Sequence, residues 1–195
     1  MSRTLLTRTI ETPVGPMIAG SITGEGEERL LCLLEFVDRP ALPRSMDDLE
    51  RPFGTVAQPD DPANPCPVLD AAQLELGQYF AGERKRFDLP LSTPGTDFQN
   101  RVWSELQRIP CGEAISYGEL ADRVGSTGAQ RAVGAANGRN RIAIIIPCHR
   151  VIESTGALRG YGGGLKRKQF LLDHERRMMG SAAGTLFDRL AETTA

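Results

Sequence analysis

Short runs of apolar and β-branched residues mark the beginning of the chain. The runs at 4–10, 17–21 and 30–36 are separated by Thr-, Pro- and Gly-rich turns, which predicts three strands. Helical spacing over 70–80 predicts a short helix, followed by a short strand at 87–91. The predicted core residues of this helix are Leu69, Leu74, Leu76 and Phe80. The beginning of the chain is therefore expected to form a small sheet with a helix.

The stretch at 38–67 is acidic and rich in proline, with few apolar residues in any regular period. Such a composition predicts a loop. Cys66 is assigned to this loop, whereas Cys32 lies in an apolar run and is expected to be a core residue.

The hydrophobic period changes to that of helices after a turn-forming cluster at 92–95, which is the predicted boundary between two domains. Thr96 and Gln99 have capping-box spacing before a helix that carries Phe98, Val102, Leu106 and Ile109 on one side. Further helices are predicted at 117–124, 129–137 and 166–178. The last should direct Phe170, Leu171 and Leu172 inward, and its basic start is expected to be solvated or to face phosphates; that start consists of Lys166, Arg167 and Lys168.

Five consecutive apolar residues at 142–146 predict a strand buried on both faces, which Pro147 ends. Cys148 and His149 follow at once, and a thiol beside an imidazole can be activated as a nucleophile. The tripeptide Pro-Cys-His fits a buried, inert cysteine beside a loop histidine equally well. The other motifs have to decide between these two interpretations.

The composition limits the class of protein in which this chemistry would take place. The chain has 195 residues, 40% of them hydrophobic, which suits a globular protein of one large or two small domains. Without an apolar run long enough for a membrane span or a signal peptide, we expect a soluble, cytoplasmic protein. The four cysteines are widely separated and only two histidines are present, so we expect neither a disulfide framework nor a metal site.

Charge is distributed unevenly along the chain. Residues 93–180 hold 13 Lys and Arg against 8 Asp and Glu, although the whole chain has a net charge of -2. The two helices at 117–124 and 129–137, joined by a Gly-containing turn, have the helix-turn-helix pattern, which binds DNA in many proteins. The second helix carries small residues and one long basic side chain, Arg131, so it fits either close approach to a nucleic-acid backbone or tight packing on a neighbouring helix.

Several motifs in order carry a more specific signal: GTDFQNRVW, IPCGEAISYGELA, QRAVGAANGRN, IPCHRV and YGGGLKRKQFLLDHE. Together they resemble the O6-alkylguanine-DNA alkyltransferase family, also called methylated-DNA-protein-cysteine methyltransferases. The earlier TPVGPM and the segment 74–91 match this family more weakly. The resemblance implies an α/β (α+β) fold. It places a small ribonuclease H-like domain of sheet and helix at 1–92, a mostly helical DNA-binding and catalytic domain at 93–180, and a tail at 181–195.

The resemblance also implies a mechanism. Cys148 would take the alkyl group of O6-alkylguanine, and by extension of O4-alkylthymine, irreversibly and once per chain. His149 would act as base through a water, oriented by Glu175, while Tyr117 would donate to N3 of the departing guanine and the Gly162 N–H to O6. Many relatives carry serine where this chain has Gly162, and tryptophan where it has Phe170.

Further roles follow from the same resemblance. The substrate site would include Asn140, Val151, Leu158, Tyr161, Gly162 and Gly163, and the DNA contacts would come from Ala129, Gln130, Arg131 and Gly134. Arg131 would fill the stack vacated by a flipped base. No cofactor or metal is implied, and the expected partner is double-stranded DNA with O6-alkylguanine lesions, bound by a monomer or by cooperatively assembled chains.

Two other classes of protein share some of these features. A non-catalytic relative that binds the same lesions would lack the cysteine, and Cys148 is present. A cysteine hydrolase with a Cys/His/Glu triad would have no use for the helix-turn-helix pattern or Arg131. Both alternatives therefore explain less of the sequence than alkyl transfer from DNA does.

Overall fold

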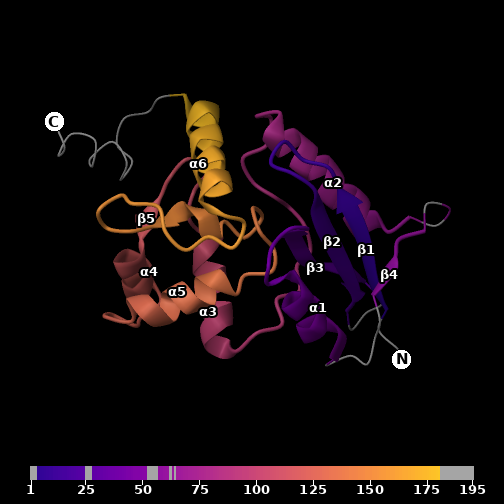
Figure 1. Cartoon of the computed structure of the whole chain (residues 1–195), viewed down its shortest axis with the longest axis horizontal. Helices are drawn as coiled ribbons and strands as arrows, with labels where there is room; N and C mark the ends of the chain where they lie inside the picture. The colour runs from indigo at the N-terminus through magenta and orange to yellow at the C-terminus, as the bar shows by residue number, and fades with distance from the viewer. Residues whose placement is uncertain (1–3, 25–27, 52–56, 62, 64, 181–195) are drawn as a thin grey trace. The chain divides into compact units, whose positions relative to one another are not determined.

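The computed structural model describes residues 4–24, 28–51, 57–61, 63 and 65–180. The chain divides into two compact units, Met1–Pro94 and Gly95–Ala195, and the tail at 181–195 lies outside the described residues (Figure 1). No helix in the described part of the chain is long and apolar enough to cross a membrane.

The first unit contains a four-stranded sheet in the order β3-β2-β1-β4. Its strands are β1 (Leu5–Ile10), β2 (Met17–Thr23), β3 (Arg29–Phe36) and β4 (Ala57–Pro59). The first three pair antiparallel in sequence order, as successive strands joined by short turns can, and β4 adds parallel to β1. The three strands predicted from the apolar runs are confirmed.

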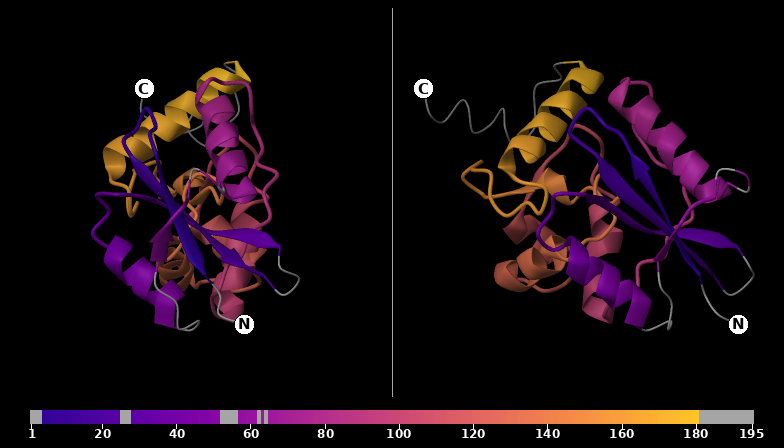
Figure 2. Two further views of the ribbon diagram at one scale, coloured as in Figure 1. Left: turned by 90° about the vertical axis from the view of Figure 1, so that its right-hand side faces the viewer. Right: turned by 45° about the vertical axis from the view of Figure 1, so that its right-hand side comes forward.

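Two helices, α1 (Leu42–Glu50) and α2 (Pro67–Phe80), lie on different sides of this sheet (Figure 2). Side chains alternate between the faces of a strand, and β1 shows this directly. Leu5 packs in a cluster with Leu49 of α1, whereas Arg8, three residues later, contacts Asp70 of α2. Cover on both faces explains why the LLCLLEF run of β3 is almost continuously apolar.

The prediction of a loop over 38–67 was wrong, because α1 and β4 lie within it. Pro43 occupies the first turn of α1, where its missing N–H costs no hydrogen bond. Leu42, Met46 and Leu49 are spaced three or four residues apart and pack on the sheet. Charged and polar residues lie between these three, so the sequence of this segment does not show an obvious apolar stripe. Cys66 lies outside these elements, directly before α2, and is buried.

Two details of the next segment also differ from the prediction. The buried side of α2 carries Leu69, Ala72, Leu76 and Tyr79, spaced three or four residues apart. Leu74 falls between them and is 62% exposed, so its assignment to the core was wrong. The strand predicted at 87–91 is reduced to a single bridge between Leu91 and Leu31.

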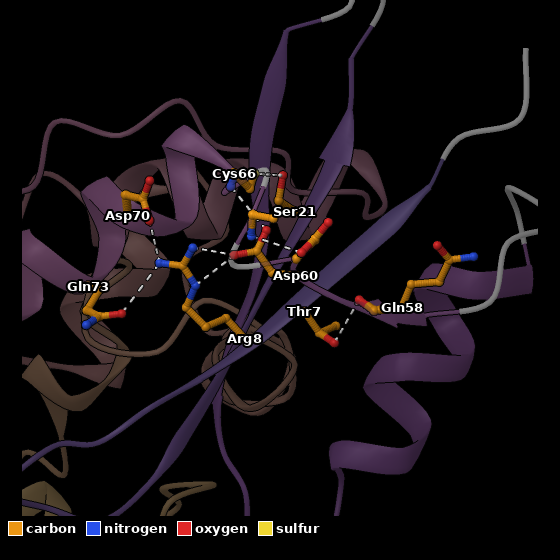
Figure 3. A network of polar contacts seen from close by, with 10 residues as sticks. Thr7, Arg8, Ser21, Gln58, Asp60, Cys66, Asp70 and Gln73 are labelled. Carbon is orange, nitrogen blue, oxygen red and sulfur yellow. Dashed lines mark hydrogen bonds and ion pairs between the residues drawn. The ribbon is translucent and has the colours of Figure 1, made fainter.

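A polar network fastens the start of α2 to the sheet (Figure 3). Arg8 pairs through Nε and Nη2 with Asp60, and its Nη1 lies 2.6 Å from Oδ1 of Asp70 on α2. Asp60 in turn accepts a hydrogen bond from the backbone N–H of Cys66, at 3.1 Å. The network therefore joins β1, the chain before α2 and the first turn of α2.

The second unit is mostly helical and holds a two-stranded parallel pairing of β5 (Ile115–Ser116) with β6 (Val151–Ile152). Its helices are α3 (Asp97–Leu106), α4 (Tyr117–Arg123), α5 (Gln130–Gly138) and α6 (Leu165–Met179), of which α3, α4 and α5 pack on one another (Figure 1). All four were predicted. The Thr96–Gln99 capping box is present in both directions, and the indole N–H of Trp103 donates to the Ala136 carbonyl at 2.9 Å.

The segment 142–146 is buried as predicted, but it is a compact turn rather than a strand. The Ile146 N–H donates to the Ile142 carbonyl at 2.9 Å, and Ile144 adopts a left-handed φ of 71°. An apolar run surrounded by core has the same pattern in either conformation, so periodicity could not distinguish them. The buried side-chain amide of Asn140 explains why the turn is preferred, because it hydrogen-bonds the backbone of Ile142 and Ile146.

Candidate active site

Cys148 lies in a single 3₁₀ turn, Cys148–Arg150, directly after the compact turn. Asn140 braces that turn from inside: its Nδ2 donates to the Ile146 carbonyl at 2.8 Å, and its Oδ1 accepts from the Ile142 N–H at 3.0 Å. The backbone groups that a strand would pair with neighbours are thus satisfied by one buried amide. Cys148 itself is buried, with 7% of its surface exposed.

Behind the cysteine, His149, Arg150 and Glu175 form a buried polar group. Nε2 of His149 lies 2.8 Å from Oε1 of Glu175, while Arg150 donates from Nε to Oε2 and from Nη2 to Oε1, both at 2.9 Å. Arg150 also donates to the Ile109 carbonyl, and the Gly112 N–H donates to Oε2 of Glu175 at 3.0 Å. The carboxylate thus accepts four hydrogen bonds.

The protonation of this group follows from its surroundings. Burial opposes the charge on Glu175, but the contacts with His149 and Arg150 outweigh it and hold its pKa well below the usual range. Burial lowers the pKa of His149, helped by the nearby charges of Arg150 and Lys168, although Glu175 acts in the opposite direction. A neutral His149 that donates from Nε2 to Glu175 has its lone pair on Nδ1, which has no partner among the described residues. This nitrogen can accept a proton.

Tyr117, the first residue of α4, supplies a hydroxyl group to the same region. Its Oη donates to the Arg159 carbonyl in a long hydrogen bond of 3.4 Å. Burial and the charges of Cys148 and Glu153 raise the pKa of Tyr117 to about 12. The phenol therefore keeps its proton at neutral pH and is available as a donor.

Lys168 is fully buried, so the prediction of a solvated or phosphate-facing side chain was wrong for this residue. Its Nζ donates to the carbonyls of Val151, at 2.6 Å, and Arg159, at 2.8 Å, and lies 6.0 Å from the centre of the Tyr117 ring. The signal that could have placed it is its spacing, because Lys168, Leu171, Leu172 and Glu175 share the buried stripe of α6.

Replacing Lys168 with methionine should change how stability depends on pH. Burial lowers the pKa of Lys168 from 10.5 to about 8, so between these values the unfolded chain binds more protons than the folded one. Stability from this group therefore rises with pH. Relative to Lys168→Met, we expect the wild-type free energy of unfolding to rise by about 2 kcal/mol between about pH 7.5 and about pH 9.5. Urea denaturation at both pH values measures this difference, and a constant difference would contradict the assignment.

An open pocket of about 810 Å³ lies beside Tyr117 in the second unit. Of the predicted site residues, its wall contains Tyr117, Gln130, Arg131, Gly134, Tyr161 and Gly162. The other predicted site residues are not part of this wall. Cys148, His149, Glu175, Asn140 and Val151 are buried, Gly163 follows Gly162, and Leu158 packs on the cluster of Ala114, Ile152 and Leu172. Ala129 immediately precedes α5.

Sequence reasoning assigned no functional role to two other wall residues, Glu153 and Ser154, whereas Arg159 lies within the segment 158–163 that was expected to line the substrate pocket. Glu153 and Ser154 belong to a turn after β6, where polar residues are ordinary and carry no distinctive pattern. Within the described residues, no group of three or more His, Cys, Asp or Glu side chains could hold a metal ion. The pocket wall consists of residues with hydroxyl, amide and charged side chains, together with several glycines.

A thiol next to a buried histidine–glutamate pair, with a protonated phenol nearby, defines the class of proteins that use a cysteine as nucleophile. Comparison with known families is more specific. Residues 97–177 match the DNA-binding domain of 6-O-methylguanine DNA methyltransferases, and residues 5–93 match the ribonuclease-like domain of the same family.

Individual relatives agree with these matches. A methylated-DNA–protein-cysteine methyltransferase of Mycolicibacterium paratuberculosis is 45% identical over 181 residues, which cover 93% of this chain and 98% of the relative. The constitutive enzyme of the same name from Bacillus subtilis is 44% identical, with 86% of this chain and 93% of the relative covered. The crystal structure of the Mycobacterium tuberculosis O6-methylguanine methyltransferase superposes with a TM-score of 0.72 at 42% identity, over 91% of this chain and 96% of that one.

The chain therefore belongs to the 6-O-methylguanine DNA methyltransferase family. It is a methyltransferase of DNA repair, which transfers alkyl groups from DNA to a protein cysteine. The expectation of an α+β fold with a ribonuclease-like first domain is confirmed.

Proposed function

We propose that this protein repairs O6-alkylguanine, and also O4-alkylthymine, in double-stranded DNA by one irreversible transfer of the alkyl group to Sγ of Cys148. The observation that carries the proposal is the neutral His149 next to Cys148, held by an ionised and buried Glu175, with Nδ1 left as an acceptor. A base of this kind is what a thiol needs in order to react at neutral pH.

The bonds and protons balance in a single displacement. The thiol proton passes to Nδ1 of His149, through a water, as Sγ attacks the alkyl carbon. The C–O6 bond breaks and its electron pair stays on guanine. Tyr117, which is protonated at neutral pH, donates a proton at N3, and the Gly162 N–H donates to O6. A thioether is a poor leaving group, so each chain would act once.

Binding to DNA is assigned to α4, the following turn and α5, which together would act as a helix-turn-helix. Ala129, Ala132 and Gly134 leave little bulk at the start of α5, so this helix can approach the minor groove closely, and Gln130 is assigned to the same DNA contact. A crystal structure of the M. tuberculosis relative was solved in complex with DNA, at 44% identity and a TM-score of 0.72, which supports DNA as the partner.

Arg131 is assigned to base flipping because it is exposed, belongs to the first turn of α5 and contributes to the wall of the pocket. A side chain that fills the gap in the stack offsets part of the cost of extruding the base, which is a few kcal/mol. We further assign the protein to the cytoplasm, acting as a monomer or in cooperative assemblies on DNA.

Replacing Arg131 with alanine tests this role. We expect the rate of repair of O6-methylguanine in duplex DNA to fall by about 10- to 100-fold, while the reaction with free O6-benzylguanine changes by less than about threefold, because a free base needs no flipping. Arg139→Ala removes an exposed arginine from the other end of α5 and serves as the control. Equal losses with both substrates would remove the flipping role from Arg131.

A further inference from the structure

The guanidinium group of Arg159 has no part in the mechanism above, although the residue lies in the wall of the pocket. Arg159 is exposed, and its side chain makes no hydrogen bond or ion pair with any described residue. The other charged residues of this wall are Arg131, on the first turn of α5, and Glu153, which follows β6. No ion pair joins Arg159 to Glu153 in the described structure, so the positive charge of Arg159 is available to a ligand.

The backbone of Arg159 is held in place although its side chain is free. Its carbonyl accepts hydrogen bonds from Nζ of Lys168 at 2.8 Å and from Oη of Tyr117 at 3.4 Å. Lys168 is fully buried and also donates to the Val151 carbonyl at 2.6 Å, so it ties Arg159 to the core of the second unit. These contacts use only the backbone of Arg159. The guanidinium group therefore extends from a fixed point on the wall.

The loop that begins with Arg159, at 159–164, is also attached to α6 near its other end. Nη1 of Arg167 donates to the Gly163 carbonyl at 3.1 Å. Gly160 has a φ of 58°, and a Cβ added there would lie 3.3 Å from Oη of Tyr117. Glycine at this position lets the loop lie close against the phenol. The loop is thus fixed near both ends, with Arg159 at its start.

The depth of the nucleophile determines which part of a substrate Arg159 can contact. The alkyl group on O6 has to reach Cys148, which is 7% exposed, so an extruded guanine must enter the pocket with its O6 edge first. Its sugar, and the two phosphates that link it to the DNA strand, then remain at the open side of the pocket. An exposed arginine in the wall lies on that side, where it can contact a phosphate but not the alkyl group.

The charges of the wall also favour an anionic ligand. Two arginines and one glutamate give it a net charge of +1. Because Arg131 is assigned to the vacated stack, Arg159 is the cation of this wall that is left to pair with a phosphate next to the extruded nucleotide. A guanidinium group suits this ligand, since its planar set of N–H donors can bind two phosphate oxygens at once.

We propose that Arg159 binds a phosphate group adjacent to the extruded nucleotide and so helps to hold the damaged base in the pocket. This inference rests on the proposed function. The anchored carbonyl fixes the place of the residue, and the phosphate supplies the counter-charge that no described residue supplies. A contact with phosphate depends neither on base sequence nor on the alkyl group. Arg159 therefore contributes to the repair of lesions in DNA but not to the reaction with a free base.

The test removes the charge of single phosphates from the substrate. Duplex DNA with O6-methylguanine carries one uncharged methylphosphonate 5′ to the lesion, 3′ to it, or several nucleotides away, and single-turnover rates are measured below saturation. We expect one of the two adjacent substitutions to slow the wild-type protein by about tenfold, the lower value for a hydrogen bond to a charged group, but to slow Arg159→Ala by less than about twofold. The distant substitution should affect both proteins equally.

The variant itself provides a second measurement. With ordinary phosphates, Arg159→Ala should repair duplex DNA about tenfold more slowly, and the slope of log rate against log salt concentration should become shallower by about 1. Its reaction with free O6-benzylguanine should change by less than about threefold, because that substrate has no phosphate. Arg177→Ala removes an exposed arginine at the far end of α6, outside the pocket wall, and is the matched control.

Four results would overturn the inference. One is an unchanged rate of duplex repair by Arg159→Ala. Another is an equal effect of each adjacent methylphosphonate on both proteins. An equal loss with O6-benzylguanine would mean that the variant disturbs the pocket itself. A loss confined to lesions whose alkyl group carries a carboxylate would mean that Arg159 pairs with the alkyl group. Absence of any reaction of the wild-type protein with O6-methylguanine would instead refute the proposed function.

Discussion

Changing Cys148 to serine is expected to abolish transfer of the alkyl group, with a rate loss of at least about 10⁴-fold. A serine hydroxyl has a far higher pKa than a thiol, so the single base available, a neutral His149, cannot generate enough of its anion to attack the alkyl carbon. Serine has the same shape as cysteine and is smaller, so it introduces no clash, and Cys148 sits in a turn held by Asn140; the fold should therefore tolerate the change. DNA with O6-methylguanine should still bind.

The measurement is incubation with duplex DNA that carries a radioactive methyl group on O6 of guanine, followed by separation of the protein. Cys66→Ser is a matched control, because Cys66 is also buried but lies in the first unit, where its Sγ contacts Oγ of Ser21 at 3.5 Å. Label on the Cys148→Ser protein would show that another residue is the acceptor, and loss of label from Cys66→Ser would show that the assay reports unfolding.

Changing Glu175 to glutamine should both destabilise the second unit and impair the reaction. Glutamine has one acceptor oxygen and an NH₂ group, so it cannot satisfy the donors of His149, Arg150 and Gly112 together, and it leaves the buried Arg150 without a counter-charge. Breaking a buried pair in this way costs about 3–5 kcal/mol. The surviving folded protein should react more slowly, because His149 loses the carboxylate that orients it.

Urea denaturation measures this loss, and Asp173→Asn is its control. Asp173 lies on the same helix but is partly exposed and only 3.7 Å from Nη1 of Arg176, so its removal should cost less than about 1 kcal/mol. A Glu175→Gln protein as stable as Asp173→Asn would mean that the buried carboxylate does not hold Arg150.

The same variant should alter the response to acid. The folded pKa of Glu175 lies below its unfolded value of 4.5, so the stability that this group contributes is fully present above that value and is lost as the pH falls toward the folded pKa. Glu175→Gln lacks this group. The difference in stability between wild type and variant should therefore shrink below about pH 4.5, and a difference that grows in acid would contradict the assignment.

The helices of the second unit could be predicted because their signals are local. Thr96 and Gln99 form the expected capping box, and Ser116 accepts a hydrogen bond from the Glu119 N–H at the start of α4. The compact turn at 142–146 could not be predicted in this way. Its apolar residues are buried on every side, and its shape depends on the amide of Asn140, whose two contacts become visible only in three dimensions.

The candidate site could be predicted in part, because some of its signals are also local. Cys148 and His149 are neighbours in sequence, and the motifs around them gave the family. The four hydrogen bonds that Glu175 accepts join α6 to Gly112 and to the turn of Cys148, and the hydrogen bond from Asn137 to the Cys148 carbonyl joins α5 to the same turn. These contacts link residues far apart in sequence, so no spacing pattern predicts them. Lys168 was misplaced because its charge was given more weight than its helical period.

The central claim is that each chain accepts one alkyl group on Cys148 and is then spent. Intact-mass measurement of the wild-type protein tests it most directly, after incubation with a large excess of duplex DNA that carries O6-methylguanine. The account predicts a mass increase of one methyl group per chain, located on the peptide with Cys148, and no further loss of methyl groups from DNA afterwards. Continued demethylation by an unmodified protein, or more than one methyl group per chain, would contradict it.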